Sequence, residues 1–517
     1  GNNFFGYKMN FVSTCCWVRR GVSAQTPVKV SLDKDELKAV IEENKAVIED
    51  LQEELEDVLD GEDDQSEKAT VKNEEDMDAN ANALTDEEIA EKYLSGYDHE
   101  EPASTLKIGS LAVFADNDTD PYLTIKDCED DENSEKEDLE IKPNDNLIVV
   151  AHVEGDACCL EVYVYNDEEN EMYVHHDIFL SSMPLALEWL DYDPSSQTSE
   201  NLVAVGYMTP VIEVWDLDVI DCLEPAFKLG KKSKKKSNKP GYGHKDAVLD
   251  LAWSHNNRHV LASGSADQTV LLWDMSQGEV NHTYQMFKDK VQVVSWHPFE
   301  TTSLLTGCCD RFVRLLDCRS HNSKEYCVGE EVEAAIWNHF DAYYLLAGTD
   351  MGNVMCYDIR MEKPCWQLRA HTQGVTALSL SSSCPGCLIT SSSDQTVKVW
   401  DILSGKPDMI LEKDEKVGSI LSCAASPDQP FIVALGGDKK DSHFKVANLK
   451  DSKTVFNRFN NRTLVQPVTY SQVAPDNNME TEAVDAMGNL QIQPSTSDSK
   501  KLLEKKKLKN VLPKKRS

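Results

Sequence analysis

Residues 243–274 read GHKDAVLDLAWSHNNRHVLASGSADQTVLLWD and decide the fold. They contain three short runs, AVLDLAW, VLASGS and TVLLWD, which are rich in apolar and β-branched residues and are separated by polar turn residues. Such runs are typical of half-buried antiparallel strands. A Gly-His pair opens the stretch and a Trp-Asp pair closes it, as in the four-stranded blades of a β-propeller. We therefore expect these residues to form one WD-repeat blade.

The same stretch holds four polar residues that can hydrogen-bond in series across a blade. They are His244, Ser263, Asp267 and Trp273, and a second set with the same spacing is His371, Thr390, Asp394 and Trp400. In both sets the Asp follows the Ser or Thr by four positions and precedes the Trp by six. A buried polar chain stabilises a fold only when each member is paired. We therefore interpret both sets as structural tetrads and not as catalytic His-Asp pairs.

Endings similar to Trp273-Asp274 recur along the chain. In order they are Tyr165-Asn166, Trp215-Asp216, Trp273-Asp274, Leu316-Asp317, Tyr357-Asp358, Trp400-Asp401 and Ala447-Asn448. Successive endings lie 50, 58, 43, 41, 43 and 47 residues apart, and the interval of 58 contains a lysine-rich insertion at residues 228–240. A period of about 40–45 residues indicates propeller blades. Seven endings predict an all-β, seven-bladed WD-repeat propeller, although the first and last copies lack the Trp.

The propeller is predicted to occupy residues 106–450, between two arms of different composition. Residues 1–30 are expected to form an N-terminal segment with a candidate propeller-associated strand. Residues 31–105 form an acidic arm with one predicted amphipathic helix, either solvated or docked on a partner, because apolar residues recur at three- and four-residue steps at Leu37, Ile41, Ile48, Leu51, Leu55 and Val58. The rest of this arm and residues 451–517 are expected to be largely disordered because they are polar and charged.

Charge is unevenly distributed over the 517 residues, whose formal net charge is −38. Two basic clusters interrupt the acidity: Lys231, Lys232, Lys234, Lys235 and Lys236 in the insertion, and Lys505, Lys506, Lys507, Lys514, Lys515 and Arg516 in the basic C-terminus. Such clusters can act as nuclear-import signals, neutralise RNA phosphates, or do both. No aromatic residues interleave with them to stack bases, which disfavours sequence-specific readout. In the acidic segments Thr85 and Ser134 each have an acid three residues on and are candidate phosphorylation sites.

Acidic residues also gather where the first strand of each blade should begin. Alignment of the loops that enter these strands places at equivalent positions Ser182, Asp246, Asp289, Glu330, Gln373 and Glu415. In a propeller such positions lie around the channel mouth, where focused field lines favour a basic ligand. We hypothesise that the four acids bind a Lys/Arg-rich protein segment, such as a histone or ribosomal-protein tail. The alternative is general surface acidity.

Motifs for catalysis are absent, since no phosphate-binding glycine loop and no G-x-S-x-G occurs. We expect no catalytic residue, cofactor, metal or small-molecule substrate. The lone C-x-x-C of Cys384 and Cys387 could indicate redox chemistry or a zinc knuckle, but its Pro-Gly centre favours a plain turn. Fifteen scattered cysteines without a secretory signal indicate reduced thiols in an intracellular protein. No run of about 18 apolar residues predicts a membrane span.

Several segments resemble the periodic tryptophan protein 1 family closely and in order. They are IKPNDNLIV at residues 141–149, YVHHDI at 173–178, MTPVIEVWDLD at 208–218 and GHKDAVLDLAW at 243–253. The W-V-R-x-G motif at 17–21 and DPYLTIKD at 120–127 fit as well. The resemblance covers roughly residues 12–450 and does not extend into the tail.

This resemblance implies a nuclear and nucleolar scaffold in large-subunit precursor assembly and ribosomal RNA processing, with a link to ribosomal DNA transcription through chromatin. The implied partners are pre-ribosomal assembly factors and ribosomal proteins, while pre-ribosomal RNA and histone tails are further candidates. Two alternatives stay open, a histone-tail chromatin reader and a substrate receptor of a cullin-type ubiquitin ligase. The usual docking cue for the latter is W-D-x-R, and the nearest endings, at Arg319 and Arg360, lack the Trp.

Overall fold

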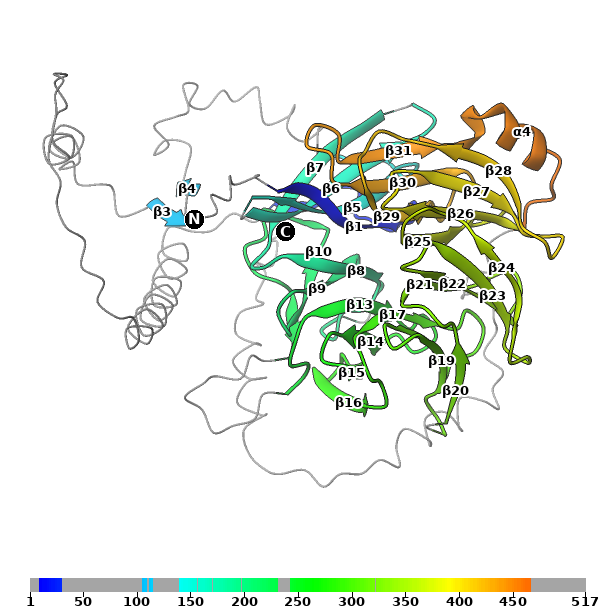
Figure 1. The fold of residues 1–517 in the computed structure, drawn as a ribbon. Helices are drawn as coiled ribbons and strands as arrows, with labels where there is room; N and C mark the ends of the chain where they lie inside the picture. The colour runs from blue at the N-terminus through cyan, green and yellow to red at the C-terminus, as the bar shows by residue number, and fades with distance from the viewer. Residues whose placement is uncertain are drawn as a thin grey trace, which may run out of the picture.

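Seven β-sheets are arranged as blades around a common axis, with the first strand of each blade innermost (Figure 1). This computed structural model describes residues 9–29, 105–108, 111–114 and 139–465, apart from residues 156, 170, 197, 231–241 and 321. The innermost strands contact one another in turn around the ring, and the last contacts the first. The predicted all-β, seven-bladed propeller is therefore confirmed.

The blades follow the order of the sequence apart from one strand. Blade 1 comprises β1 (Asn10–Val18), β5 (Asn146–Glu154), β6 (Ala157–Asn166) and β7 (Glu171–Phe179), and blade 2 comprises β8 (Pro184–Leu190), β9 (Leu202–Tyr207), β10 (Ile212–Asp216) and β12 (Phe227–Leu229). Blade 3 comprises β13 (Val248–Trp253), β14 (Val260–Ser265), β15 (Val270–Asp274) and β16 (Glu279–Tyr284), and blade 4 comprises β17 (Val291–Trp296), β18 (Ser303–Cys308), β19 (Phe312–Asp317) and β20 (Ser323–Cys327).

Blade 5 comprises β21 (Val332–Trp337), β22 (Tyr344–Thr349), β23 (Asn353–Asp358) and β24 (Pro364–Arg369), and blade 6 comprises β25 (Val375–Leu380), β26 (Cys387–Ser392), β27 (Val397–Asp401) and β28 (Asp408–Lys413). Blade 7 is a sheet of three strands, β29 (Ile420–Ala425), β30 (Ile432–Gly437) and β31 (Phe444–Asn448). Outside the blades, β2 (Val28–Lys29) pairs in parallel with β11 (Val219–Ile220), and β3 (Thr105–Ile108) forms a hairpin with β4 (Leu111–Phe114).

The second strand of a blade is the most deeply buried element of the fold. All six residues of β9, β14, β18, β26 and β30 are buried. Such a strand is covered on both faces by neighbouring blades, so it needs small and apolar residues on both sides and loses the alternation of a surface strand. This explains runs such as VLASGS at residues 260–265.

Strand β1 closes the ring from a distant part of the sequence. It pairs antiparallel with β5, from Asn10 opposite Glu154 to Val18 opposite Leu147. It also contacts β29 of blade 7, and the indole nitrogen of Trp17 donates a 2.9 Å hydrogen bond to the carbonyl oxygen of Ala424. The segment predicted at residues 1–30 therefore contributes the innermost strand of blade 1, and the following strand of that blade begins only at residue 146.

A repeated contact between glycine and valine spaces the blades. A Cβ added to the glycine of a second strand would lie 3.1 Å or less from a valine near the start of the next innermost strand. The pairs are Gly206 with Val248, Gly264 with Val291, Gly307 with Val332, Gly348 with Val375 and Gly436 with Val12. The last pair joins blade 7 to β1. We call this junction between blade 7 and blade 1 the seam. It is packed in the same way as the joints between consecutive blades.

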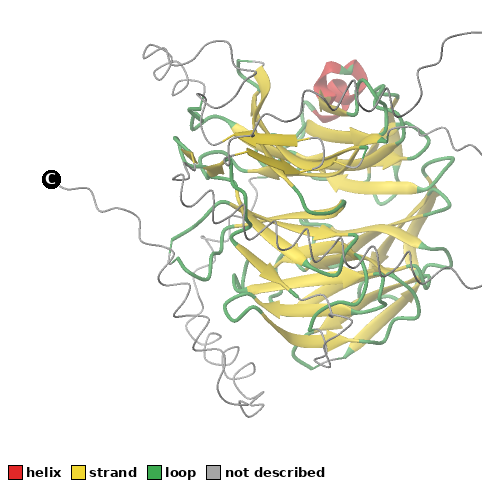
Figure 2. Cartoon of the chain, turned by 90° about the vertical axis from the view of Figure 1, so that its left-hand side faces the viewer, coloured by secondary structure: helices red, strands yellow, loops and turns green. Residues whose placement is uncertain are grey.

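The chain after blade 7 differs from the predicted disordered tail of residues 451–517. A 3-10 helix, η1 (Leu449–Asp451), leads into α4 (Lys453–Phe459), which packs against β28 at the edge of the ring (Figure 2). Val455 and Phe459 are buried in the apolar cluster shared by blades 6 and 7. Asp401 accepts hydrogen bonds from Arg458 at 2.7 Å and Arg462 at 2.6 Å. Order extends into this segment because it supplies apolar and cationic groups to the outer edge of the blades.

Within the described residues, no helix is long and apolar enough to cross a membrane. The predicted helix of the acidic arm, both basic clusters and the candidate phosphorylation sites Thr85 and Ser134 lie outside the described residues.

Candidate functional site

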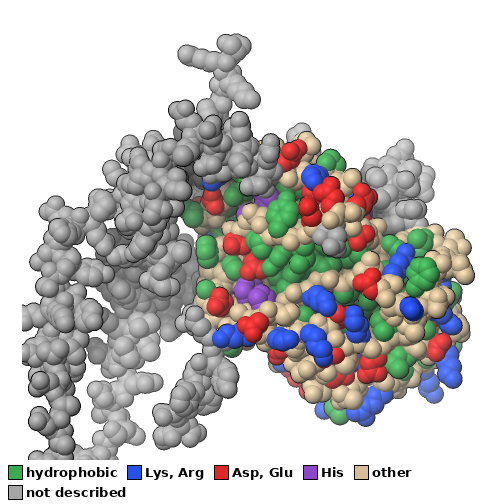
Figure 3. All heavy atoms as spheres, turned by 90° about the horizontal axis from the view of Figure 1, so that it is seen from above, with side chains coloured by type: hydrophobic (Ala, Val, Ile, Leu, Met, Phe, Trp, Pro, Cys, Tyr) green, Lys and Arg blue, Asp and Glu red, His purple; other side chains and the backbone are tan. Residues whose placement is uncertain are grey.

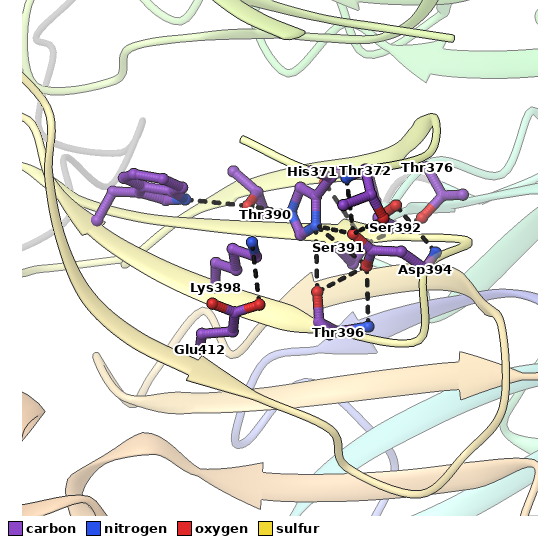
Figure 4. Close-up of polar contacts among 12 residues, drawn as sticks. His371, Thr372, Thr376, Thr390, Ser391, Ser392, Asp394, Thr396, Lys398 and Glu412 are labelled. Carbon is purple, nitrogen blue, oxygen red and sulfur yellow. Dashed lines mark hydrogen bonds and ion pairs between the residues drawn. The ribbon is translucent and has the colours of Figure 1, made fainter. Parts of the chain in front are cut away.

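Each predicted tetrad lies within a single blade. It extends from the Trp on the third strand to the His in the loop before the first strand. In blade 6, Trp400 Nε1 donates to Thr390 Oγ1 at 3.1 Å, and the same oxygen lies 2.7 Å from His371 Nε2 (Figure 4). His371 Nδ1 lies 3.1 Å from Asp394 Oδ2. In blade 3 the corresponding distances are 2.8, 2.7 and 3.1 Å, for Trp273, Ser263, His244 and Asp267.

The protonation states in blade 6 follow from these contacts. Burial lowers the pKa of His371, so the imidazole is neutral and its Nδ1 proton points at Asp394. Burial alone would raise the pKa of Asp394, but hydrogen bonds from Thr396 and from the Thr372 backbone lower it to about 2. The side-chain polar atoms of the blade 6 tetrad are therefore all paired, as a stabilising buried network requires. These histidines are held by structural partners and are not available as general bases.

Blades that lack the tryptophan use other polar groups at the same turn. In blade 4 Asp310 accepts from the Lys288 backbone at 3.2 Å and pairs with the buried Arg314 at 2.8 Å, so an arginine replaces the histidine as the side-chain partner of the turn aspartate. In blade 5 Glu330 accepts from Thr349 at 2.6 Å and from Asn353 at 2.9 Å. Its carboxylate is therefore used inside the blade.

The four predicted rim acids divide into two kinds. Asp246 is exposed and Asp289 is partly exposed, and each carboxylate accepts a hydrogen bond from the backbone of the following residue. Glu330 is engaged by Thr349 and Asn353, and Glu415 is buried and paired with Lys413 and Lys445, both at 2.7 Å. Burial would raise the pKa of Glu415, but these lysines lower it. Asp246 and Asp289 are therefore the two of the four that have no paired cation among the described residues.

Further acids join Asp289 at the same end of the ring. Glu331, Glu333 and Cys309 bring their oxygen and sulfur atoms within 4.8 Å of one another. Burial raises the pKa of Glu333, Lys290 opposes this, and the charges of Asp350 and Glu331 raise it further. Burial likewise raises the pKa of the Cys309 thiol to about 11, with Glu333 raising it and Lys290 lowering it next. We call Asp246, Asp289, Glu331 and Glu333 the acidic rim.

The position of Glu333 reflects a repeated irregularity of the innermost strands. In all seven blades the register between the first two strands shifts near the start, which leaves one residue unpaired. In blades 4 and 5 the unpaired residues are Gln292 and Glu333, and Gln292 Nε2 donates to Glu333 Oε2 at 3.3 Å. A bulge turns its side chain away from the regular alternation. The missed rim residue could have been found by aligning the second residue of each innermost strand.

Two other carboxylates belong to the wall of the ring and not to its mouth. Glu188 on β8 accepts from the Trp253 backbone at 3.0 Å, and Asp250 on β13 accepts from the Val294 backbone at 2.8 Å. Burial raises the pKa of Glu188 to about 8 and that of Asp250 to about 7. Each side chain joins one innermost strand to the next, so we regard both as joints between blades.

Cys384 lies in the turn between β25 and β26, and Cys387 begins β26; the Cys387 amide donates to the Cys384 carbonyl at 3.3 Å. Both cysteines are free and buried, and burial raises the pKa of Cys384 to about 11. The geometry is that of a turn, and neither thiol has the low pKa that nucleophilic chemistry needs. The described residues therefore form a closed ring that bears the acidic rim near the starts of its innermost strands.

Comparison with known proteins gives two family models and several relatives. The model described as "WD domain, G-beta repeat" matches residues 236–274, and that described as "Nucleolar protein 10-like, N-terminal domain" matches residues 316–449. The chain is 37% identical over 464 residues to a Periodic tryptophan protein 1 homolog of Drosophila melanogaster, covering 87% of this chain and 96% of that protein. It is 33% identical to Periodic tryptophan protein 1 of Saccharomyces cerevisiae, covering 81% and 84%. An uncharacterized WD repeat-containing protein of Schizosaccharomyces pombe is 34% identical, covering 83% and 88%.

Proposed function

The chain belongs to the periodic tryptophan protein 1 family, and on that premise we propose that it is a non-catalytic scaffold in ribosome biogenesis. It would act in large-subunit precursor assembly and ribosomal RNA processing, in the nucleus and nucleolus. The match to a nucleolar protein model over residues 316–449 supports this location. A scaffold needs a rigid surface and no reactive centre, and a propeller with tetrads held in place by hydrogen bonds provides such a surface.

The observation that carries the proposal is the acidic rim. Asp246 and Asp289 stand at equivalent positions of neighbouring blades, and Glu331 and Glu333 extend the acidity to blade 5. Carboxylates gathered at the mouth of a ring focus the field on an approaching cation. Ribosomal-protein tails rich in Lys and Arg have the complementary charge. We propose that the rim binds such a tail, and that the link to chromatin and ribosomal DNA transcription uses histone tails at the same surface.

The basic clusters outside the described residues would serve a different part of the same function. Lys231–236 and the C-terminal cluster around Lys505 and Arg516 carry charge suited to pre-ribosomal RNA phosphates. We propose that they provide nuclear import and non-specific RNA contact, while the propeller binds proteins. Phosphorylation of the acidic arm would add negative charge and compete with RNA for these clusters.

Charge reversal of the rim tests the proposal. The Asp246→Lys/Asp289→Lys double variant should bind a Lys/Arg-rich ribosomal-protein peptide at least about tenfold more weakly than the unmodified chain, which corresponds to about 1.4 kcal/mol. The matched control is Glu279→Lys/Glu362→Lys, which makes the same charge change at exposed positions away from the rim. Binding measured by fluorescence anisotropy that is equal in the rim variant and the control would contradict a rim site.

The alternatives make different demands on the same surfaces. A histone-tail reader would use the same rim but would bind histone peptides without RNA, and retention of histones after RNase treatment with loss of ribosomal proteins would favour it. A ubiquitin-ligase receptor would need Arg360 free for docking. Arg360 instead pairs with Asp358 at 2.6 Å and lies over the Tyr343 ring at 4.2 Å. A ubiquitin-ligase receptor is therefore the least supported of the three functions.

A further inference from the structure

The seam between blades 7 and 1 contains a polar cluster that the acidic rim does not include. His152 lies on β5, Glu161 on β6, and His443 immediately precedes β31 of blade 7. One ligand atom from each of the three lies within 4.8 Å of the other two. Figure 3 shows the molecule from above, and on this face histidine side chains lie beside acidic ones. The cluster therefore joins the two ends of the propeller near the surface.

His152 is oriented by oxygen atoms on both sides of its ring. Nδ1 lies 2.6 Å from Glu161 Oε1, and Nε2 lies 2.9 Å from Asn10 Oδ1. The Asn10 amide comes from β1, so the closing strand itself fixes the ring. With its Nε2 proton held by Asn10, His152 can present the Nδ1 lone pair to a metal ion. This is the usual arrangement of a ligating histidine, whose second nitrogen is held by an oxygen.

Glu161 is also oriented by an outer partner. Its second carboxylate oxygen accepts a 2.8 Å hydrogen bond from the Tyr163 hydroxyl on the same strand. The first oxygen, Oε1, points at His152 Nδ1. Two of the three candidate ligands therefore have outer hydrogen bonds that hold the donor atom toward the centre of the cluster.

His443 supplies a donor atom that is not used by the fold. Its Nδ1 is buried and has no hydrogen-bond partner in the part of the chain that the structure describes. Its ring stacks on that of His152, with centroids 4.2 Å apart and an angle of 17° between the planes. A buried polar atom without a partner destabilises the fold, so its presence calls for a ligand or a compensating contact.

We propose that His152 Nδ1, the Glu161 carboxylate and His443 Nδ1 bind a zinc ion at the seam of the propeller. Two imidazoles and one carboxylate form a donor set that zinc prefers, with a fourth position left to water. Zinc–nitrogen and zinc–oxygen bonds are about 2.0–2.2 Å, so the ligand atoms around the ion must lie about 3.3–3.5 Å apart. His152 Nδ1 and Glu161 Oε1, which are 2.6 Å apart, must therefore separate to admit the ion. Because the rings stack, the His443 imidazole must also turn toward the centre. Binding replaces the proton between His152 and Glu161, which leaves to solvent.

The ion would have a structural effect that follows from the position of its ligands. Two ligands belong to blade 1 and the third to blade 7, so the metal would link the blades at the point where no peptide connection joins them. The site would also involve β1, because Asn10 on that strand hydrogen-bonds to His152. Zinc binding should therefore stabilise ring closure and should not depend on the acidic rim.

The test uses the full chain stripped with a chelator and then dialysed against zinc chloride alone. Bound metal measured by mass spectrometry should be one equivalent higher in the unmodified chain than in His443→Ala or Glu161→Gln. Cobalt chloride in place of zinc should give the intense visible bands of a tetrahedral site, and both variants should lose them. His282→Ala, on the outer strand of blade 3, is the matched histidine control and should keep the equivalent and the bands.

A conservative variant separates metal binding from loss of fold. Asn10→Ala removes the outer partner of His152 and should weaken zinc binding about 10–100-fold while keeping the cobalt bands at saturating metal. Circular dichroism should show that Glu161→Gln remains folded, and added zinc should raise the Tm of the unmodified chain but not of this variant. Equal zinc content in the unmodified chain and both ligand variants, without cobalt bands in any of them, would overturn the proposal.

Discussion

The indole nitrogen of Trp17 donates a 2.9 Å hydrogen bond to the carbonyl oxygen of Ala424, across 407 positions of sequence. The two residues lie on β1 and β29, the innermost strands of blades 1 and 7, and these strands contact each other. This contact joins the two ends of the propeller without a covalent connection. The stability of the whole ring therefore depends on a strand at the start of the chain.

Replacement of Trp17 tests this dependence. Trp17→Ala removes a buried indole and its hydrogen bond, and it should lower the free energy of unfolding by about 3–5 kcal/mol. Trp366→Ala, on the outer strand of blade 5, is the control and should cost less because that side chain is only partly buried. Urea titration followed by circular dichroism measures both. Similar losses of unfolding free energy for the two variants would mean that the contact between blades 7 and 1 does not contribute more to stability than an outer strand does.

The glycine contact at the seam provides a second test. Gly436→Ala places a Cβ 2.5 Å from Val12 Cγ1, so it should destabilise the protein by about 1–3 kcal/mol, as Gly307→Ala should between blades 4 and 5. Val12→Ala reduces the crowding at the seam. The Gly436→Ala/Val12→Ala double variant should therefore lose less stability than the sum of the single variants. Strict additivity in urea titrations would show that β1 does not pack there.

The buried tetrad of blade 6 predicts a large effect from a small change. Thr390→Val keeps the side-chain volume but leaves Trp400 Nε1 and His371 Nε2 without a partner. Each unpaired buried group costs about 1–3 kcal/mol, so the free energy of unfolding should fall by about 2–4 kcal/mol. Thr283→Val, at an exposed position of β16, should change it little. Thermal unfolding at fixed pH checks both, and a neutral Thr390→Val would contradict the hydrogen-bonded chain.

Glu188 predicts a pH dependence with a defined sign. Its folded pKa is about 8, raised from 4.5 by burial, so the folded state holds a proton that the unfolded state releases between these values. Stability should therefore fall as pH rises from about 4.5 to 8, because ionisation is penalised only in the fold. Glu188→Gln keeps the acceptor for the Trp253 amide and removes the titration.

The difference in unfolding free energy between Glu188→Gln and the unmodified chain should change with pH. The two should unfold with the same free energy at pH 4, while at pH 8.5 the variant should be more stable by on the order of 2 kcal/mol. Urea titrations at the two pH values measure this difference. A constant offset between the proteins at both values would mean that folding does not raise the pKa of Glu188.

The sequence was sufficient for the blades and less so for the parts that depend on distant contacts. The tetrad spacing and the seven endings predict the propeller because each blade is a local unit with its own pattern. The role of β1 could not be predicted from the same pattern, since its partner strand begins at residue 146 and no repeat spacing links them. Helix α4 was missed because its residues look polar, and only Val455 and Phe459 reveal the buried side.

The acidic rim shows the same division between local and distant information. The positions of Asp246 and Asp289 follow from the alignment of loops. Glu415 occupies an equivalent position, but Lys445, thirty residues later on β31, pairs with its carboxylate. Glu333 was overlooked because a bulge, and not the strand alternation, decides where its side chain points. Pairing and bulges are tertiary properties that a single blade sequence does not display.

Recovery of the full chain from cells, followed by RNA sequencing and mass spectrometry of what remains bound, tests the proposed scaffold most directly. Large-subunit precursor RNA and ribosomal assembly factors should be recovered, and the chain should sediment with large particles that RNase disrupts. Recovery of neither precursor RNA nor assembly factors, with sedimentation unchanged by RNase, would contradict it.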